Sequence, residues 1–267
     1  MLVMAACRES SMVYETVDGS KLPLLVFDPA DGTPLAAGIV LFHGGGLRSG
    51  SADGLVAHCR ELGSRGIFAV SAGYRLLGQG AASIDDCVAD VRQAVEHFTR
   101  LAAARGLKPS CLASGGSSAG AHLALVAALT ASGTTPTVPG PGVAAVVALN
   151  PAGLDLLAFS PERQRSIEQE VGIATGRAIE YSLIEFVRPG SPLMLIHHGT
   201  ADEVEPIEHV RRFRDAMVQA GNECTLLEYE QAEHGFHYPG HSGHFEDVID
   251  ATARFLLDRS HAGPYGY

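Results

Sequence analysis

A serine flanked by glycines is the residue of this sequence whose surroundings most clearly suggest chemistry. Gly116, Ser118 and Gly120 match the pattern G-x-S-x-G, between a run of small apolar residues and a run with helical spacing. In such a strand-to-helix turn the serine takes a positive φ, and the flanking backbone comes too close for a β-carbon. The hydroxyl is then exposed beside the N–H groups of the helix, where negative charge is favoured. We predict that Ser118 is a nucleophile, although a small-residue turn without a function would match the same pattern.

A glycine-rich loop supplies the second group of candidate residues. His43 and three glycines, among them Gly45 and Gly46, follow the apolar run 37–42. The tetrahedral intermediate of acyl transfer carries an oxyanion, and a glycine loop can turn its N–H groups toward that charge without side chains in the way. We predict an oxyanion hole made by the N–H groups of Gly45, Gly46 and Ala119, and we expect His43 to anchor the loop. The alternatives are a flexible loop and a phosphate-binding loop, but no G-K-[ST] follows the glycines.

A nucleophilic serine needs a base, and the base needs a carboxylate that orients it. Asp202 follows the apolar run 193–197, and His234 follows the run 224–229. The chain order is therefore serine, aspartate, histidine, which is the order of hydrolases built on a parallel sheet. We predict that His234 is the base and that Asp202 is its partner.

Other acids and histidines compete for these two roles. Glu203 and Glu205 lie nearer the start of the next predicted helix, so we expect them to serve as helix caps. His237, His241 and His244 are expected on a solvated loop. Their spacing would also suit a metal ion, but no cluster of cysteines or carboxylates supports one. We therefore expect neither a metal nor a cofactor.

The elements that must position these residues are read from hydrophobic periodicity. An antiparallel hairpin is predicted around the turn Asp18-Gly19. Beyond it, buried strands alternate with amphipathic helices. The predicted strands are 37–42, 67–72, the run before Ser118, 143–149, 193–197 and 224–229, and the predicted helices are 52–64, 84–104, the run from Ala119 to about Thr130, 206–220 and 245–258.

This alternation predicts an α/β fold with a mostly parallel sheet covered by helices on both faces. We expect residues 1–267 to form a single domain. The more polar segment 151–190 is predicted to be an inserted lid, with helices at 161–170 and 178–187. Ligands of such sheets bind at the carboxyl ends of the strands, where the loops with the candidate residues lie.

Composition limits the classes of partner. The net charge is −11, and no basic cluster is present, so nucleic acid and anionic membranes are poor partners. Five scattered cysteines without a C-x-x-C pair argue against disulfides and zinc. The apolar start lacks the basic region of a signal peptide, so we expect a cytoplasmic protein. The sequence leaves a homodimer open.

Taken together, the motifs resemble those of α/β-hydrolases of the hormone-sensitive-lipase-like esterase group, which carry an HGGG loop. The matching pieces are HGGG at 43–46, YRL at 74–76, GSSAGAHLA at 116–124, HGTAD at 198–202 and HGF at 234–236. The resemblance implies that Ser118 is the nucleophile, that His234 is general base and acid with Asp202 as its partner, and that Gly45, Gly46 and Ala119 form the oxyanion hole. It implies hydrolysis of short-chain carboxylic esters through an acyl-enzyme.

The sequence also departs from that group. Ser117 stands where the group usually has aspartate, the Pro-Glu that commonly follows YRLA is missing after Leu76, and strands begin by Val13 in place of a helical cap. These features favour smaller relatives that resemble acetyl-xylan or feruloyl esterases, dienelactone hydrolases and kynurenine formamidases. The absence of Trp and an aromatic content of 6% predict a small acyl group. An amidase, a thioesterase, a natural-product tailoring enzyme and a non-catalytic small-molecule binder are the alternatives.

Overall fold

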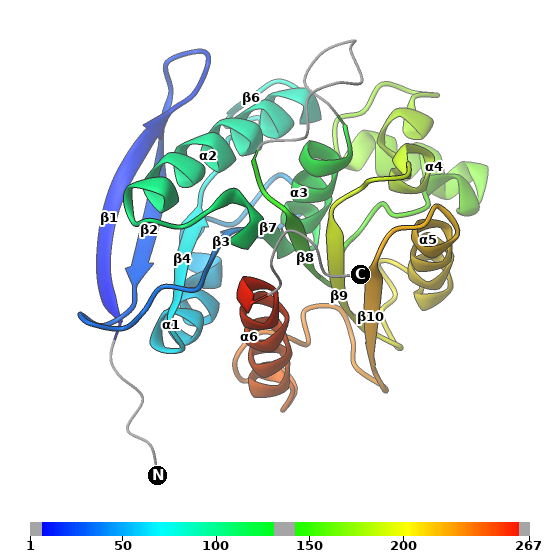
Figure 1. The fold of residues 1–267 in the computed structure, drawn as a ribbon. Coiled ribbons are helices and arrows are strands. Elements are labelled where there is room, and N and C mark those ends of the chain that lie inside the picture. Colours follow the sequence, from blue (N-terminus) through cyan, green and yellow to red (C-terminus); the bar gives the residue numbers. More distant parts are fainter. Residues whose placement is uncertain (1–6, 131–141, 262–267) are drawn as a thin grey trace.

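The central parallel sheet that the alternating pattern predicts is present. A computed structural model describes residues 7–130 and 142–261. Its main sheet has eight strands in the order β1-β2-β4-β3-β7-β8-β9-β10, and β5 and β6 form a separate two-stranded sheet (Figure 1). The strands are β1 Arg8–Glu15, β2 Lys21–Asp28, β3 Ala37–Phe42, β4 Ile67–Ala72, β5 Leu76–Leu77, β6 Gly80–Ala81, β7 Leu112–Ser117, β8 Ala145–Leu149, β9 Leu193–Gly199 and β10 Cys224–Tyr229.

Pairing within the sheet follows the prediction. β1 and β2 form the antiparallel hairpin, with Arg8 opposite Asp28 and Glu15 opposite Lys21, and β2 is antiparallel to β4. From β4 to β10 all neighbouring strands are parallel. The carboxyl ends of β3, β7, β9 and β10 therefore lie at one edge, so the sequence places the loops with the candidate residues on the same side of the sheet.

Helices cover both faces of the sheet, as predicted. Because side chains alternate along a strand, β3 contributes Val40 and Phe42 to one core and Ile39 and Leu41 to the other. Helices α2, α3 and α5 pack on the first face, and α1 and α6 pack on the second. The α-helices are α1 Val56–Ser64, α2 Ile84–Ala104, α3 Ala119–Leu129, α4 Pro161–Glu170, α5 Ile207–Gln219 and α6 Phe245–His261, and the 3-10 turns are η1 Ala52–Leu55, η2 Pro109–Cys111, η3 Leu156–Ala158, η4 Ala178–Tyr181 and η5 Leu183–Phe186.

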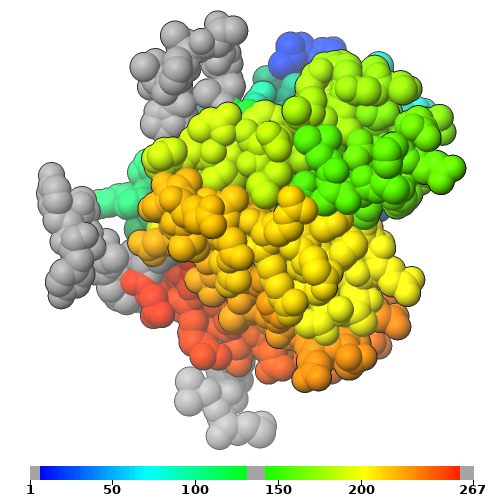
Figure 2. Space-filling model, turned by 90° about the vertical axis from the view of Figure 1, so that its right-hand side faces the viewer, coloured from blue at the N-terminus to red at the C-terminus, as the bar shows by residue number. Residues whose placement is uncertain are grey.

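The segment 151–190 differs in part from its prediction. The helix expected at 161–170 is α4, but 178–187 forms two 3-10 turns, η4 and η5, in place of a helix. The N–H groups of Leu183 and Ile184 donate to the carbonyl groups of Gly153 and Leu154, so they are not free to continue a helix. In Figure 2 this segment, green to yellow-green, forms the upper part of the face that is shown.

Within the ranges 7–130 and 142–261, no helix combines the length and the apolar character needed to cross a bilayer.

Candidate active site

Ser118 occupies a strained turn between β7 and α3. Its φ is 52° and its ψ is −119°, which confirms the predicted positive φ. A β-carbon on Gly116 would lie 2.4 Å from the carbonyl oxygen of Phe42, and one on Gly120 would lie 2.2 Å from the same oxygen. Neither position tolerates a side chain, because the obstacle is backbone. The flanking glycines therefore permit the turn that exposes the Ser118 hydroxyl.

The structure brings together the three residues predicted for a triad. His234 Nε2 lies 2.9 Å from Ser118 Oγ, and His234 Nδ1 lies 2.7 Å from Asp202 Oδ2. A carboxylate only accepts, so Nδ1 carries the proton and Nε2 is left to accept the hydroxyl proton of Ser118. The His234 side chain is 25% exposed and the Asp202 side chain is fully buried. This geometry suits general-base activation of a serine.

The environment of Asp202 favours its charged form. Its Oδ1 accepts hydrogen bonds from the N–H groups of Val204 and Glu205, at 2.8 and 3.1 Å. Burial by itself raises the pKa of Asp202, but the hydrogen bond and charge of His234, the nearby His198 and the backbone N–H groups outweigh it. The net pKa lies below the ordinary value, so Asp202 is a carboxylate at neutral pH.

The two competing glutamates do not have the predicted role. Helix α5 begins at Ile207 without a side-chain cap. Glu205 is buried, and its Oε2 accepts a hydrogen bond of 2.8 Å from the N–H of Gly153. The expected capping by Glu203 and Glu205 is therefore wrong, because the chain turns Glu205 inward toward the loop that follows β8.

Two of the three predicted oxyanion donors share the cavity with Ser118, and the third does not. Gly46 and Ala119 line the same cavity as Ser118, whereas Gly45 is not part of that lining. No acceptor among the described residues binds the N–H groups of these three residues. Gly45 and Gly46 have φ values of 117° and 61°, and a β-carbon on Gly45 would come within 2.2 Å of the carbonyl oxygen of Ser49. The loop therefore needs glycine to hold its N–H groups in place.

His43 anchors this loop, as expected. The residue is buried, and its ring stacks on the ring of Tyr74 with centroids 4.4 Å apart. The Tyr74 hydroxyl donates to the carbonyl of His43 at 2.9 Å, and His43 Nδ1 donates to the carbonyl of Gly44 at 2.8 Å. Burial lowers the pKa of His43. The YRL motif thus contributes to the shape of the glycine loop.

A second serine–histidine contact lies next to the first, and the sequence reasoning missed it. His237 Nε2 lies 2.9 Å from Ser117 Oγ, and His237 Nδ1 lies 2.9 Å from His58 Nε2. The Tyr238 hydroxyl donates to Ser117 Oγ at 3.2 Å. The expected solvated position is wrong for His237, which is completely buried, whereas His241 is exposed. Only the fold brings His58 to this loop, so spacing along the chain gives no signal for the contact.

Asn150 is another site residue without a signal in the sequence. It follows β8, is fully buried and has a φ of 35°. Its Nδ2 lies 3.2 Å from His234 Nε2, the nitrogen whose lone pair faces Ser118 Oγ. The side chain therefore contacts the nitrogen that faces Ser118 and helps to fix the histidine ring.

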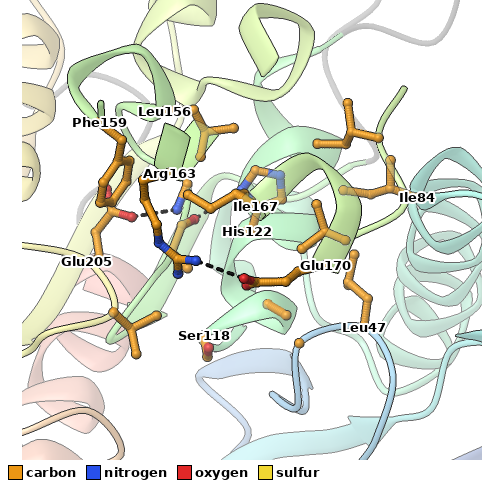
Figure 3. A pocket seen from close by; sticks show the side chains of 17 residues that line it. Leu47, Ile84, Ser118, His122, Leu156, Phe159, Arg163, Ile167, Glu170 and Glu205 are labelled. Atoms are coloured by element: carbon orange, nitrogen blue, oxygen red, sulfur yellow. Dashed lines mark hydrogen bonds and ion pairs between the residues drawn. The ribbon is translucent and has the colours of Figure 1, made fainter. Parts of the chain in front are cut away.

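An apolar cavity of about 140 Å³ opens above Ser118 (Figure 3). Helix α4 covers it with Arg163, Ile167 and Glu170, and an ion pair of 2.8 Å joins Arg163 to Glu170. Its apolar lining includes Leu47, Ile84, Leu156, Phe159, Ile167 and Val171. In the described parts of the chain, no three His, Cys, Asp or Glu side chains are grouped so that they could hold a metal ion.

Among the solved structures similar to this chain are several forms of an esterase from the Planctomycetes species Thermogutta terrifontis. Esterase 2 of Thermogutta terrifontis phosphonylated by sarin has a TM-score of 0.82 and 30% identity, with 96% of this chain and 97% of that chain covered. The propionate-bound and butyrate-bound forms of Est2 from the same species each have a TM-score of 0.79 and 30% identity, with 99% and 98% covered. Among curated proteins, none matches the chain.

The family model named BD-FAE matches residues 24–217, which include β7, α3 and the loop with Asp202. That range is most of the chain. The parallel sheet, the strained turn at Ser118 and the similarity to esterases over nearly the full length agree with this match. The chain belongs to the BD-FAE family and is a carboxylic ester hydrolase with the α/β-hydrolase fold.

Proposed function

We propose that the protein hydrolyses short-chain esters through an acyl-enzyme on Ser118. The observation that carries this proposal is the hydrogen-bonded line from Asp202 through His234 to Ser118, which ends at an apolar cavity. His234 takes the hydroxyl proton as Ser118 Oγ attacks the ester carbonyl, and the oxyanion rests on backbone N–H groups. The alcohol leaves with the proton from His234. Water then attacks the acyl-enzyme, again with His234 as base, and releases the acid and Ser118.

In this mechanism the backbone N–H groups of Gly45, Gly46 and Ala119 bind the oxyanion. Ala119 and Gly46 line the cavity with Ser118, and the N-terminus of α3 adds a favourable field. One such donor contributes about 3 kcal/mol of transition-state stabilisation. Asp202 keeps the His234 proton on Nδ1 and stabilises the imidazolium that forms.

The size of the cavity supports a small acyl group. A cavity of roughly 150 Å³ holds a ligand of about the size of benzene, and this one measures about 140 Å³. The Thermogutta terrifontis esterase has been solved with propionate and with butyrate bound. We infer that residues 1–267 form one domain, that 151–190 acts as its lid, and that a small-molecule ester is the substrate.

The loop 43–46 also supports a place among the HGGG esterases that resemble hormone-sensitive lipase, close to the acetyl-xylan, feruloyl and dienelactone-hydrolase-like relatives. The loop lies beside Ser118, where that group is expected to bind the oxyanion.

The test compares p-nitrophenyl acetate, butyrate and decanoate, with a matched thioester and anilide of butyrate. We expect the highest kcat/KM for acetate or butyrate. A preference for decanoate would contradict the small acyl group, and a lack of activity on every ester would contradict the proposed function. Faster cleavage of the thioester or anilide would reassign the substrate class.

A further inference from the structure

On the basis of the proposed function, we propose that His122 is a substrate-binding residue. Its free ring nitrogen accepts a hydrogen bond from a hydroxyl or N–H group on the part of the substrate that occupies the cavity. The preferred substrates are then short esters that carry such a donor, and plain alkyl esters are poorer substrates.

The placement of His122 puts it close to the reacting serine. It lies one turn after Ser118 on α3, and its N–H donates to the Ser118 carbonyl at 3.0 Å. The residue is 7% exposed and belongs to the cavity lining, above Ser118 in Figure 3. A substrate bound at Ser118 therefore extends past this ring.

Its hydrogen bonds assign the tautomer. Nδ1 lies 3.0 Å from the carbonyl oxygen of Ala152, which only accepts, so Nδ1 carries the proton. Burial lowers the pKa of His122 to about 4, so the ring is neutral at neutral pH. Nε2 then holds a lone pair. The one side-chain hydrogen bond of His122 within the described residues uses Nδ1, and Nε2 is not among the fully covered polar atoms that lack a partner, so it keeps accessible surface. His122 therefore offers the cavity an acceptor and no donor.

The ring is held rigidly in this orientation. A β-carbon on Gly153 would lie 2.6 Å from His122 Nδ1, so the backbone after β8 packs directly against the ring. Gly153 is fixed in turn, because its N–H donates to the buried Glu205 Oε2 at 2.8 Å. The buried glutamate thus holds the backbone that orients the histidine.

Four other polar side chains line the cavity, namely Ser118, Arg163, Glu170 and Glu205. Arg163 and Glu170 pair with each other. The second oxygen of Glu205 has no hydrogen-bond partner among the described residues, but it is covered by protein atoms and lies 3.4 Å from His209 Nδ1. The side chains of the remaining lining residues are apolar. A nearly buried acceptor without a protein partner, beside apolar side chains, favours a ligand that donates to it, because a plain alkyl chain removes its water without replacing the hydrogen bond.

The experiment measures how fast the wild-type protein hydrolyses matched pairs of ester substrates. In the acyl arm, p-nitrophenyl butyrate is compared with its 2-hydroxy, 3-hydroxy and 3-oxo derivatives. In the alcohol arm, ethyl acetate is compared with 2-hydroxyethyl acetate, and each rate is divided by that of hydroxide-catalysed hydrolysis. We expect kcat/KM for one hydroxylated ester to exceed that of its parent by about tenfold. The 3-oxo ester offers an acceptor in place of a donor, so its kcat/KM should not exceed that of the parent ester. If the gain appears in the acyl arm, the donor that binds His122 lies on the acyl part of the substrate, and if it appears in the alcohol arm, the donor lies on the alcohol part.

Two substitutions of His122 separate its two hydrogen bonds. The amide of His122→Asn can still donate to Ala152 but leaves no acceptor at the position of Nε2, so the hydroxyl-to-parent ratio falls toward one. The longer amide of His122→Gln places an oxygen nearer to that position and restores part of the ratio. His97→Asn, on α2 and outside the cavity lining, keeps the wild-type ratio.

The proposal is overturned if neither arm shows a gain in the wild-type protein, or if His122→Asn keeps the full ratio. If circular dichroism shows that His122→Asn is unfolded, the comparison of hydroxy and oxo esters with their parent esters in the wild-type protein still tests the proposal. Hydrolysis of the parent butyrate tests the proposed function separately, so a missing ratio with intact hydrolysis contradicts only the role of His122.

Discussion

Two neighbouring serines each contact a histidine of the same loop. Ser118 pairs with His234 and Ser117 pairs with His237, and both nitrogen–oxygen distances are 2.9 Å. By distance alone the two pairs are equivalent. Their surroundings differ in three ways. The two histidines have different partners at Nδ1, which we call the third member of each pair, they carry their proton on different nitrogens, and only the Ser118 pair reaches the cavity.

The third member sets the direction of the proton. His234 Nδ1 donates to Asp202, which leaves Nε2 to accept from Ser118. In the second pair, His58 Nε2 lies 2.9 Å from His237 Nδ1 and 3.1 Å from the carbonyl oxygen of His237. That carbonyl only accepts, so His58 Nε2 carries the proton, His237 Nδ1 accepts, and His237 Nε2 donates to Ser117.

Charge and access differ as well. A carboxylate stabilises the imidazolium that a base becomes, whereas burial lowers the pKa of His58 to about 4 and makes it neutral. Burial also lowers the pKa of His237, which has no exposed surface, while the side chain of His234 is 25% exposed. We therefore propose that Ser118, and not Ser117, is the nucleophile, because only the Ser118 pair has both a carboxylate and the cavity beside it.

The largest expected effect separates the two serines. Ser118→Ala should lower kcat on p-nitrophenyl butyrate by roughly 10⁵-fold, because it removes the attacking oxygen. Ser117→Ala is the matched control and should keep kcat within about tenfold, since it loses only two structural hydrogen bonds. Equal losses in steady-state kinetics would make the two pairs functionally equivalent and contradict the account.

The second effect concerns the carboxylate. Asp202→Asn should lower kcat by roughly 10⁴-fold, because an amide N–H facing Nδ1 shifts the proton of His234 to Nε2, the nitrogen that must accept. Circular dichroism checks that the fold is kept. Unchanged turnover in this variant would show that the third member does not distinguish the pairs.

The buried histidines predict a pH-dependent stability. Burial lowers the pKa of His58 to about 4, against about 6.5 in an unfolded chain. Between these values the unfolded chain binds a proton that the folded chain does not, so stability is full above about pH 6.5 and is lost as pH falls toward 4. At pH 5, protonation of His58 in the unfolded chain alone lowers the free energy of unfolding by about 2 kcal/mol. Urea titrations at pH 7, 6 and 5 measure it; a flat or opposite trend would be inconsistent with neutral buried rings.

The smallest effect is expected at the edge of the second pair. Tyr238→Phe removes the hydroxyl that donates to Ser117 and should lower the free energy of unfolding by about 1 kcal/mol. Turnover should change by less than about twofold, because the Ser118 pair does not use this bond. A large loss of kcat at unchanged stability would assign the second pair a direct role in the reaction.

Much of the fold follows from local pattern in the sequence. The runs 37–42 and 67–72 are buried along their whole length, so their apolar character alone predicts strands β3 and β4 with the correct bounds. The glycines around Ser118 likewise predict the turn, because the steric demand is local. The structure of segment 178–187 could not be predicted in this way, because backbone hydrogen bonds to Gly153 and Leu154 override its helical pattern.

The site shows the same division. The sequence places Ser118, Asp202 and His234 on loops that the parallel sheet must bring together, and the structure holds them in contact. It does not separate His237 from the solvated histidines near it, because His58 lies 179 positions away along the chain. Nor does it predict that Glu205 turns inward, since its partner is a backbone N–H with no signal in the sequence.

Covalent labelling tests the central claim most directly. The protein is treated with a fluorophosphonate, which reacts with an activated serine hydroxyl, and the modified peptide is fragmented in the mass spectrometer to separate Ser117 from Ser118. One adduct per chain is expected, located on Ser118 and absent from Ser118→Ala. An adduct on Ser117, or a folded protein that takes no label, would contradict it.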